Sequence, residues 1–203
     1  MGRRFLLIDG HPDAGRLSGH LLDLYQQALP AGTALDRIAI RDLDFDPNLA
    51  RGYADIPPLE PDLARALELI EGCDHLALAF PLWWGAEPAR LKGFWDRALL
   101  PRRAFRYHDR DPWWDRLLAG RSADLLVTMD TPPAYLRLAY FDPLGWRYRR
   151  QVLGFVGFSP IRLHYFGPVR RGGAERSLPR WQARITRAAD RASTTRPRKR
   201  ILG

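Results

Sequence analysis

The sequence has a single cysteine, Cys73, among its 203 residues. An internal disulfide and a cysteine-rich metal site are therefore both excluded, and we expect no metal centre. The longest apolar run, residues 76–84, is far shorter than the roughly 20 residues that a membrane-spanning helix needs. The opening segment MGRRFLLIDGHPD also has too short an apolar stretch for a secretory signal peptide. These absences predict a protein of the cytoplasm.

Two common nucleotide-binding motifs are missing as well. The sequence contains neither GxGxxG, which is typical of dinucleotide-binding folds, nor the GxxxxGK[ST] loop that cradles phosphates in many kinases and ATPases. Candidate residues for a nucleophilic triad are also scarce. Neither of the two usual ways of holding a nucleotide phosphate is available to this chain.

Positive charge is concentrated near the end of the chain. The formal net charge is +9, and residues 170–203 hold eleven Arg or Lys against two acidic residues, Glu175 and Asp190. We predict one domain over residues 1–192 and a basic, disordered tail over residues 193–203. Four arginines follow the polar face of a predicted amphipathic helix: Arg180, Arg184, Arg187 and Arg191. We expect no specific nucleic-acid partner, but binding of the tail to nucleic acid or to an anionic membrane stays open as an alternative.

Apolar runs of strand length alternate with segments of helical periodicity. A polar and aromatic stretch without period, residues 105–114, interrupts this pattern as an excursion. Strands that alternate with helices form a parallel sheet covered by helices on both faces, so the predicted fold class is α/β. The expected strands are residues 4–9, 34–43, 75–80, 122–129 and 161–166, and the expected helices are residues 17–29, 62–72, 88 onward, 146–157 and a last one that carries Leu178, Trp181, Ile185 and Ala188.

Ligands of such sheets bind at the carboxyl ends of the strands, which directs attention to the loop after the first strand. This loop, GHPDAGRLSGH, begins at Gly10 and runs into the next helix. A helix N-terminus offers unpaired N–H groups that suit a phosphate. Ser18 can add a hydroxyl, Gly19 allows close approach, and His11 can donate a further hydrogen bond. In the alternative interpretation, Ser18 is a helix cap and His11 a turn residue.

The loop after the third strand carries two adjacent tryptophans, in the sequence FPLWWGAEP. Trp83 and Trp84 fall where the chain is expected to turn, outside the regular spacing of core aromatics. Their indoles can form a wall for a planar ring, a contact that contributes about 0.5–1.5 kcal/mol beyond burial. Backbone groups around Trp84–Ala86 would then face the polar edge of that ring. In the alternative, both indoles pack over the edge of the sheet.

Two segments together carry a resemblance to a known family: GHPDxxxxS at residues 10–18 and FPLWWGxxPAxLKGFWDR at residues 80–97. The sequence resembles the flavodoxin-like NAD(P)H:quinone oxidoreductases, a group that includes ancillary reductases of potassium-efflux systems and modulators of drug activity. The likeness runs from Arg4 to about Phe166. It implies a flavodoxin-like three-layer sandwich with a five-stranded parallel sheet in the order 2-1-3-4-5. It also implies tightly bound FMN or FAD, through which NAD(P)H reduces a quinone by ping-pong hydride transfer.

The resemblance further implies which residues hold the flavin. The first loop holds the phosphate, and the loop after the third strand lines the ring system. The loop after the fourth strand reads MDTPPAY, residues 129–135, where the family usually has TTGG followed by a tyrosine. In this loop Thr131 can reach the pyrimidine side of the flavin, and Tyr135 is the one candidate for acid–base catalysis. The implied cofactor-binding residues are His11, Ser18, Gly19, His20, Pro81, Leu82, Trp83, Trp84, Gly85 and Thr131.

Two prolines in place of two glycines distinguish this chain from the family pattern. Pro132 and Pro133 cannot donate backbone N–H groups, which weakens the expected hold on that edge of the flavin. An alternative function follows: a catalytically weakened regulatory or ancillary subunit that binds a membrane transport protein. The resemblance also implies a homodimer with the pocket at its interface. Aromatic residues available for such an interface are Phe105, Tyr107, Trp113, Trp114, Tyr140, Phe141 and Trp146.

Overall fold

A parallel sheet of five strands organises the chain, in a computed structural model that describes residues 2–170 and 172–195. The strands lie in the order β2-β1-β3-β6-β7, and each neighbouring pair is parallel. Counted along the chain without the two short strands of a separate hairpin, this is the predicted order 2-1-3-4-5, which is confirmed. The strands are β1 (Arg4–Asp9), β2 (Ala34–Ala39), β3 (His75–Pro81), β6 (Ser122–Thr128) and β7 (Ile161–Phe166).

The central strands are the most apolar because helices cover both of their faces. Every residue of β3 and of β6 is buried, as are five of the six residues of β1. The edge strand β2 is only partly buried and ends at Ala39, before the predicted end at residue 43. The strand stops because Ile40–Asp42 form a 3-10 turn, which buries Ile40 and brings Arg41 to the carboxylate of Asp9.

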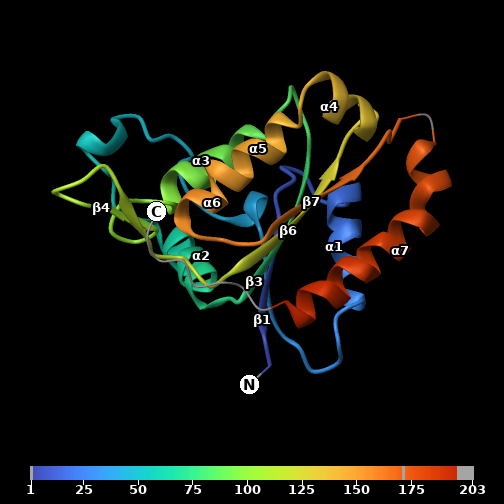
Figure 1. Cartoon of the computed structure of the whole chain (residues 1–203), viewed down its shortest axis with the longest axis horizontal. Helices are drawn as coiled ribbons and strands as arrows, with labels where there is room; N and C mark the ends of the chain where they lie inside the picture. Colours follow the sequence, from blue (N-terminus) through green and yellow to red (C-terminus); the bar gives the residue numbers. More distant parts are fainter. Residues whose placement is uncertain (1, 171, 196–203) are drawn as a thin grey trace.

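Two helices cover one face of the sheet, α1 (Leu17–Gln27) and α7 (Gly173–Thr194) (Figure 1). Their apolar stripes pack on alternate residues of the strands, and the Trp181 ring meets the Phe166 ring edge-on, with centroids 5.6 Å apart. Because α7 continues to Thr194, the predicted domain boundary at residue 192 falls inside a helix. The rest of the predicted tail, residues 196–203, lies outside the described residues, and the single domain stays a prediction.

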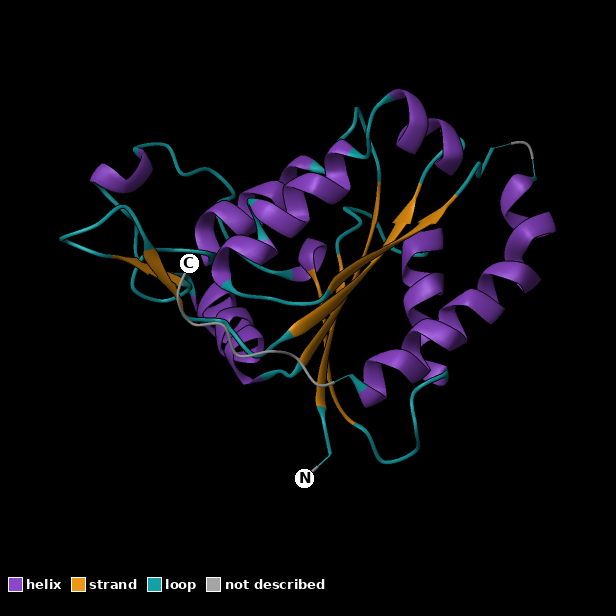
Figure 2. Cartoon of the chain, in the orientation of Figure 1, coloured by secondary structure: helices purple, strands orange, loops and turns teal. Residues whose placement is uncertain are grey.

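Four helices cover the opposite face, as the purple ribbons of Figure 2 show. They are α2 (Pro61–Gly72), α3 (Ala89–Ala98), α5 (Pro143–Arg150) and α6 (Leu153–Val156). The indole N–H of Trp95 in α3 donates to the hydroxyl of Tyr148 in α5 (3.1 Å), so a buried hydrogen bond joins these two helices. The prediction of one helix over residues 146–157 is wrong. The carboxylate of Asp142 caps α5 through the N–H of Gly145, which starts the helix early, and α5 then ends before α6 begins.

Two further elements were not predicted. Helix α4 (Pro133–Ala139) begins at the second of the two adjacent prolines, a residue type that suits the first turn of a helix. The excursion after α3 contains a small antiparallel hairpin of β4 (Phe105–Tyr107) and β5 (Trp114–Arg116), whose three-residue strands are too short to show a period. Within residues 2–170 and 172–195, no helix combines the length and apolar character that crossing a bilayer requires.

Candidate functional site

The three loops singled out by the sequence all leave the carboxyl edge of the sheet. They follow β1, β3 and β6, three strands that are neighbours in the order β1-β3-β6 (Figure 1). The first loop starts tightly against the core, because the N–H of Gly10 donates to the carbonyl of Ala79 (2.8 Å). A Cβ at Gly10 would come within 2.6 Å of the Leu91 side chain, so glycine is required for this close approach.

His11 links the first loop to the loop after β3. Its ring meets the Trp83 ring edge-on, with centroids 5.5 Å apart. Nδ1 of His11 lies 2.9 Å from the backbone nitrogen of Asp13 and 3.1 Å from its carbonyl oxygen, and Nε2 makes no hydrogen bond within the described residues, so Nε2 is open to a ligand. Burial lowers the pKa of His11, outweighing the hydrogen bond to Asp13 and the nearby carboxylates, which raise it. His11 is therefore neutral at neutral pH.

Ser18 is the clearest mark of a binding site. It is buried in the first turn of α1, and within the described residues its hydroxyl oxygen has no hydrogen-bond partner. The alternative interpretation of Ser18 as the helix cap is wrong, because the N-cap position belongs to Arg16. A buried hydroxyl left without a partner costs free energy, so its retention at a helix N-terminus fits a group that is supplied by a ligand. A phosphate suits this position.

Beside Ser18, a carboxylate lies under the start of α1. The Oδ2 of Asp9 pairs with Arg41 (2.5 Å), and Oδ1 accepts the N–H of His11 (3.1 Å). A Cβ at Gly19 would stand 3.3 Å from Oδ2 of Asp9, so Gly19 lies close to this carboxylate, and its approach to a phosphate stays a prediction. The sequence reasoning did not find the Asp9–Arg41 pair. The only sign of this pair in the sequence was Asp9, an acidic residue at the end of an otherwise apolar strand.

His20 lies apart from the tryptophan pair. It is exposed and lines a cleft of about 400 Å³ together with three arginines, Arg16, Arg37 and Arg41. Each of these arginines already pairs with a carboxylate, namely Asp13, Asp23 and Asp9. His20 is therefore close to the first turn of α1 but on the side of β2.

The tryptophan loop is a tight two-residue turn. The N–H of Trp83 donates to the carbonyl of Ala86 (2.9 Å), and the N–H of Ala86 donates back to Trp83 (3.0 Å). Trp84 and Gly85 both have positive φ, 50° and 81°, as a type I′ turn requires. The N–H and C=O of Ala86 are therefore used within the turn, while the expectation that the backbone of Trp84 and Gly85 faces a ligand stays a prediction.

The turn displays its two indoles while the residues before it are held in the sheet. Trp84 is fully exposed and Trp83 about half exposed, so Trp84 does not pack over the sheet edge. Pro81 is the buried last residue of β3, and the N–H of Leu82 donates to the carbonyl of Thr128 (2.8 Å). Of the predicted ring-binding residues, Trp83 and Trp84 are therefore exposed to solvent. Pro81 and Leu82 lie beneath them and anchor the loop to the sheet.

An ion pair that the sequence did not reveal lies directly beneath this turn. The Glu87 side chain is completely buried and pairs with Arg147 of α5. Apart from this ion pair, neither carboxylate oxygen has a hydrogen-bond partner within the described residues. Glu87 and Arg147 line a cleft of about 390 Å³ together with Trp83 and Trp84. The pair thus ties the tryptophan turn to α5.

The loop after β6 contributes less to the site than predicted. Pro132 and Pro133 are the N-cap and first residue of α4, and neither lines the cleft at the tryptophans. Thr131 is half-buried. Tyr135 lies exposed on α4, with its ring edge-on to Tyr140 at 5.4 Å. No contact described here brings Thr131 or Tyr135 to the first loop, so their roles stay predictions.

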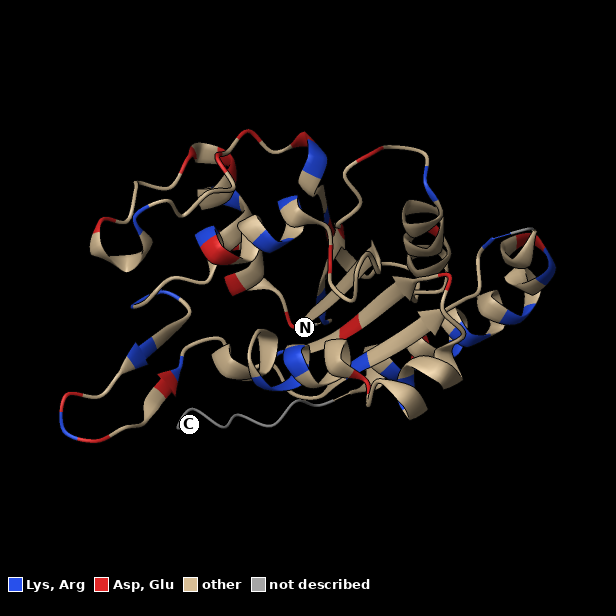
Figure 3. Cartoon of the chain, turned by 90° about the horizontal axis from the view of Figure 1, so that it is seen from above, with Lys and Arg blue, Asp and Glu red and all other residues tan. Residues whose placement is uncertain are grey.

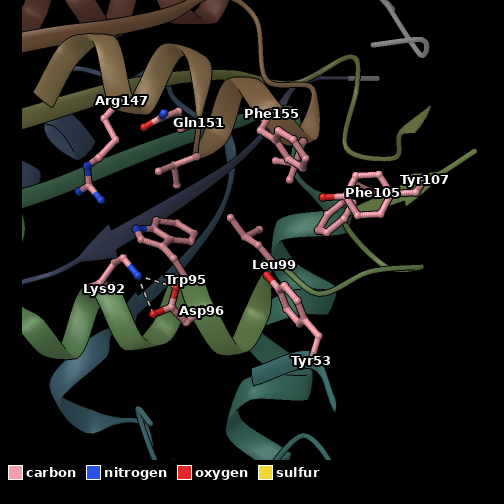
Figure 4. Close-up of a pocket in the computed structure, with 12 residues that line it drawn as sticks. Tyr53, Lys92, Trp95, Asp96, Leu99, Phe105, Tyr107, Arg147, Gln151 and Phe155 are labelled. Carbon is pink, nitrogen blue, oxygen red and sulfur yellow. Dashed lines mark hydrogen bonds and ion pairs between the residues drawn. The ribbon is translucent and has the colours of Figure 1, made fainter. Parts of the chain in front are cut away.

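A groove continues from the tryptophan cleft between α3 and α5. It has a volume of about 360 Å³ and shares Lys92 and Arg147 with that cleft. Figure 4 shows Lys92, Asp96 and Trp95 along one wall, with the Lys92–Asp96 ion pair (2.6 Å), and Arg147 and Gln151 along the other. Aromatic side chains close its far end: Tyr53, Phe105, Tyr107 and Phe155.

Comparison with known proteins agrees with the fold. Residues 3–190 match the model of a protein family that is described as having a flavodoxin-like fold. The chain belongs to this family. Among curated members, the FMN-dependent NADH:quinone oxidoreductase of Nitratidesulfovibrio vulgaris strain DP4 is 30% identical over 85% of this chain and 78% of its own length. FMN-dependent NADH:quinone oxidoreductase 2 of Pseudomonas fluorescens strain Pf-5 is 27% identical over 93% of this chain and 100% of its own length.

Solved structures show the same flavodoxin-like arrangement. Smu.1420 from Streptococcus mutans UA159 superposes with a TM-score of 0.78 at 22% identity, covering 92% of this chain and 98% of its own. The NAD(P)H:quinone oxidoreductase from Methanothermobacter marburgensis gives a TM-score of 0.77 at 21% identity, covering 96% of this chain and 99% of its own. The predicted fold class is confirmed.

Proposed function

We propose that this chain is a flavin-dependent NAD(P)H:quinone oxidoreductase and that its flavin is FMN. The observation that carries the proposal is the buried, unpartnered hydroxyl of Ser18 at the N-terminus of α1, next to a loop that contacts the exposed tryptophan turn. The curated relatives with the same fold are named as FMN-dependent quinone oxidoreductases, which supports both the reaction class and the choice of FMN over FAD.

The residues present fit a flavin phosphate and ring system. Ser18 and the N-terminal amides of α1 would hold the phosphate, and the neutral His11 would donate to it or to the adjacent chain of the cofactor. Arg41 neutralises Asp9, so the carboxylate under the helix does not repel an anion. Trp83 and Trp84 would line the ring, and Gly85 keeps their turn in its shape.

When bound, the flavin supplies the two-electron chemistry that links the nicotinamide donor to the quinone. The protein's part is to orient the planar groups and to exclude water from the ring face. Tyr135 is our proposed proton donor to the acceptor, because it lies on α4 at the same edge of the sheet. Steady-state kinetics with NADH and with NADPH identify the donor.

We also propose that the protein is a homodimer. The groove between α3 and α5, with exposed Tyr107 at its far end, and the exposed Trp113 nearby in the hairpin offer a surface for a second copy. Light scattering coupled to size-exclusion chromatography measures this directly, and a monomer at micromolar concentration would contradict it. The alternative of a transporter-binding ancillary subunit is not favoured, and the cytoplasmic setting stays a prediction.

The decisive experiment is mass spectrometry of the ligand released from purified protein, followed by anaerobic titration with NADH or NADPH. We expect FMN, and bleaching of its absorbance on addition of the donor. A protein that carries no flavin and takes up neither FMN nor FAD would contradict the proposal.

A serine substitution tests the observation itself. Ser18→Ala removes a hydrogen bond to a charged phosphate, worth about 1.5–3 kcal/mol, so FMN should bind roughly 10- to 100-fold more weakly. Because the hydroxyl has no partner among the residues that the structure describes, the apo form should unfold at the same temperature or slightly higher. Ser177→Ala on α7 is the matched control and should leave FMN affinity unchanged. A variant that loses stability but keeps its FMN affinity would assign Ser18 a structural role.

A further inference from the structure

A charged surface lies on α7, beside the edge strand β7. Arg180, Arg184 and Arg187 recur at helical spacing outside the buried stripe that carries Trp181 and Ile185. Figure 3 shows Lys and Arg recurring in blue along this helix, at the right of the view. A solvated helix face usually mixes both signs of charge, and this stretch of α7 does not.

Helix α4 adds a fourth arginine to this surface. The guanidinium of Arg184 donates to the carbonyl of Tyr165 (3.2 Å) and lies 5.0 Å from the centre of the Phe166 ring. The guanidinium of Arg137 lies 5.5 Å from the centre of the Tyr165 ring. Burial lowers the pKa of Arg184, and so do the positive charges of Arg137 and of its neighbours on α7. The four cations are thus close enough to repel one another.

The positive charge of this surface is not neutralised within the described residues. Arg137, Arg180 and Arg187 form no ion pair with a carboxylate in residues 2–170 and 172–195. Nearby arginines do: Arg149 pairs with Asp142, and Arg170 pairs with Asp130. A surface that keeps like charges together without acids is suited to an anionic partner.

Apolar side chains protrude from the same segment of the chain as Arg137. Leu138 is 79% exposed and Phe141 is 85% exposed, and Tyr140 between them is also exposed. Single exposed apolar residues are common, but a contiguous group marks an interaction surface. We define the basic–apolar patch as Arg137, Leu138, Tyr140, Phe141, Arg180, Arg184 and Arg187.

We infer that the basic–apolar patch binds the surface of an anionic lipid bilayer. Cations flanking protruding apolar side chains are the composition of interfacial segments, which insert the apolar groups and attract anionic headgroups. The inference rests on the proposed function: many quinones are lipid-soluble, and α4 directly follows the loop after β6 at the carboxyl edge of the sheet (Figure 1). Docking through this patch would bring the candidate site to its substrate.

Two comparisons favour a bilayer over other partners. The hairpin also exposes an aromatic residue, Trp113, but Asp109 and Asp111 flank Arg110 before it, so that surface has no excess of positive charge. Proteins that bind single-stranded nucleic acid rely on aromatic rings that stack on bases. The patch has two such rings, Tyr140 and Phe141, but its protruding Leu138 has no ring to stack and can insert among acyl chains.

Flotation of the full-length protein with vesicles tests the charged part of the patch. We expect binding to vesicles of equal parts phosphatidylcholine and phosphatidylglycerol, no binding to phosphatidylcholine alone, and weakening by salt. Each arginine near an anionic surface contributes about fivefold, so Arg180→Gln with Arg187→Gln should weaken binding roughly 25-fold. The control, Arg65→Gln with Arg110→Gln, makes the same change of net charge at exposed positions on α2 and the hairpin, and binding should stay within about twofold.

A second pair of variants tests the apolar part. Leu138→Ser with Phe141→Asn should weaken vesicle binding about tenfold, because inserted apolar area is lost. Trp113→Asn, the matched control on the hairpin, should have no effect. Residues 193–203 are the same in every variant, so their contribution cancels. Unchanged circular dichroism and melting temperature show that each variant is folded.

The outcomes separate this inference from the proposed function. Equal binding to neutral and anionic vesicles, or equal loss in patch and control variants, overturns the bilayer inference. So does a dimer that Leu138→Ser dissociates, or tighter binding to mixed-sequence RNA that the patch variants abolish. Reduction of a water-soluble short-chain quinone should be the same in all variants. If it is, failure to bind vesicles leaves the proposed function intact, whereas a wild type that takes up no flavin removes the proposed function itself.

Discussion

The two edges of the sheet treat their polar groups in opposite ways. At the amino edge, on the face covered by α1 and α7, the hydroxyl of Tyr25 donates to Asp124 (3.0 Å) and lies 3.0 Å from Nε2 of His75. Nδ1 of His75 lies 2.8 Å from the hydroxyl of Ser122. On the far side of the same carboxylate, Nε2 of His164 lies 3.3 Å from Asp124. Each of these side chains has a partner of complementary type, and at this edge Nε of Arg3 is a buried polar atom without a hydrogen-bond partner within the described residues.

At the carboxyl edge, the same fold leaves polar groups open and apolar groups exposed. The Ser18 hydroxyl has no partner within the described residues, and the carboxylate of Glu87 has only its ion pair with Arg147. Trp84 is fully exposed and lies at a φ that side chains rarely adopt. This difference separates stability from ligand binding. The polar network at the amino edge stabilises the fold, whereas the carboxyl edge has polar groups whose hydrogen bonds a ligand can complete.

Removing the centre of the amino-edge network should have the largest effect. Asp124→Ala leaves His75, Tyr25 and Arg162 facing a buried gap, and breaking a buried charged network costs about 3–5 kcal/mol. Chemical denaturation measures this loss. The control is Asp130→Ala, which breaks an exposed pair with Arg170 and should cost less than about 1 kcal/mol. An equal decrease in the free energy of unfolding for Asp124→Ala and Asp130→Ala would contradict the stabilising role of the amino edge.

The pH dependence of stability should come from the amino edge. Burial lowers the pKa of His75 to about 4, outweighing the raising effect of Asp124. The unfolded chain, with an ordinary histidine pKa near 6.5, binds the proton more readily. Stability should therefore be full above about pH 6.5 and should fall by about 3 kcal/mol as the pH drops to 4.

Denaturation at a series of pH values follows this loss. Asp124, whose carboxylate accepts hydrogen bonds in the network and whose pKa is lowered, adds to it in the same direction at lower pH. His75→Gln should flatten the profile between pH 6.5 and 4, whereas His20→Gln at the exposed carboxyl edge should not. If His20→Gln flattens the profile, the pH dependence comes from the carboxyl edge, and its assignment to His75 is wrong.

Neutralising the buried acid at the carboxyl edge should have an intermediate effect. Glu87→Gln removes one charge of a pair whose other member, Arg147, still reaches solvent, so the expected cost is about 1–3 kcal/mol. FMN affinity should fall as well, because Glu87 ties the tryptophan turn to α5. Isothermal titration of the apo protein with FMN gives the affinity. A loss of stability as large as that of Asp124→Ala would show that this edge also carries the fold.

The smallest effect on stability should come from the exposed indole. In Trp84→Asn the new residue tolerates positive φ, so the free energy of unfolding should change by less than about 0.5 kcal/mol. FMN should bind roughly 2- to 12-fold more weakly, the equivalent of one aromatic contact. Trp113→Asn on the hairpin is the control for removing an exposed indole. An unchanged affinity would exclude Trp84 from the ring site.

The sequence predicted those parts of the fold that depend on local pattern. The apolar runs of β3 and β6 located the sheet, because burial on both faces leaves a continuous signal, and the apolar stripe of α7 located that helix. The order of the strands followed from the resemblance. The early end of β2 and the division of α5 from α6 depend on Arg41 reaching Asp9 and on Asp142 capping α5. Such contacts are set by packing and leave no period in the sequence.

The same distinction applies to the site. The turn residues Trp83 to Gly85 and the helix start at Ser18 were recognisable because each residue type has a local conformational meaning. The Glu87–Arg147 pair joins residues 60 positions apart, and a lone acid before a proline gives no sign that it is buried. Tyr135 followed from resemblance alone, and the structure shows its ring against Tyr140, while its catalytic role stays a prediction.

The geometry of the tryptophan turn also limits how this chain can diversify. At position 84 the backbone is left-handed, so Asn, Asp and Gly are the substitutes that keep the turn at little cost, while β-branched and other bulky residues strain it. Position 83, with ordinary backbone, has no such restriction. Variation in the choice of flat acceptor is therefore most accessible through position 83, and an enzyme engineer would begin a library there.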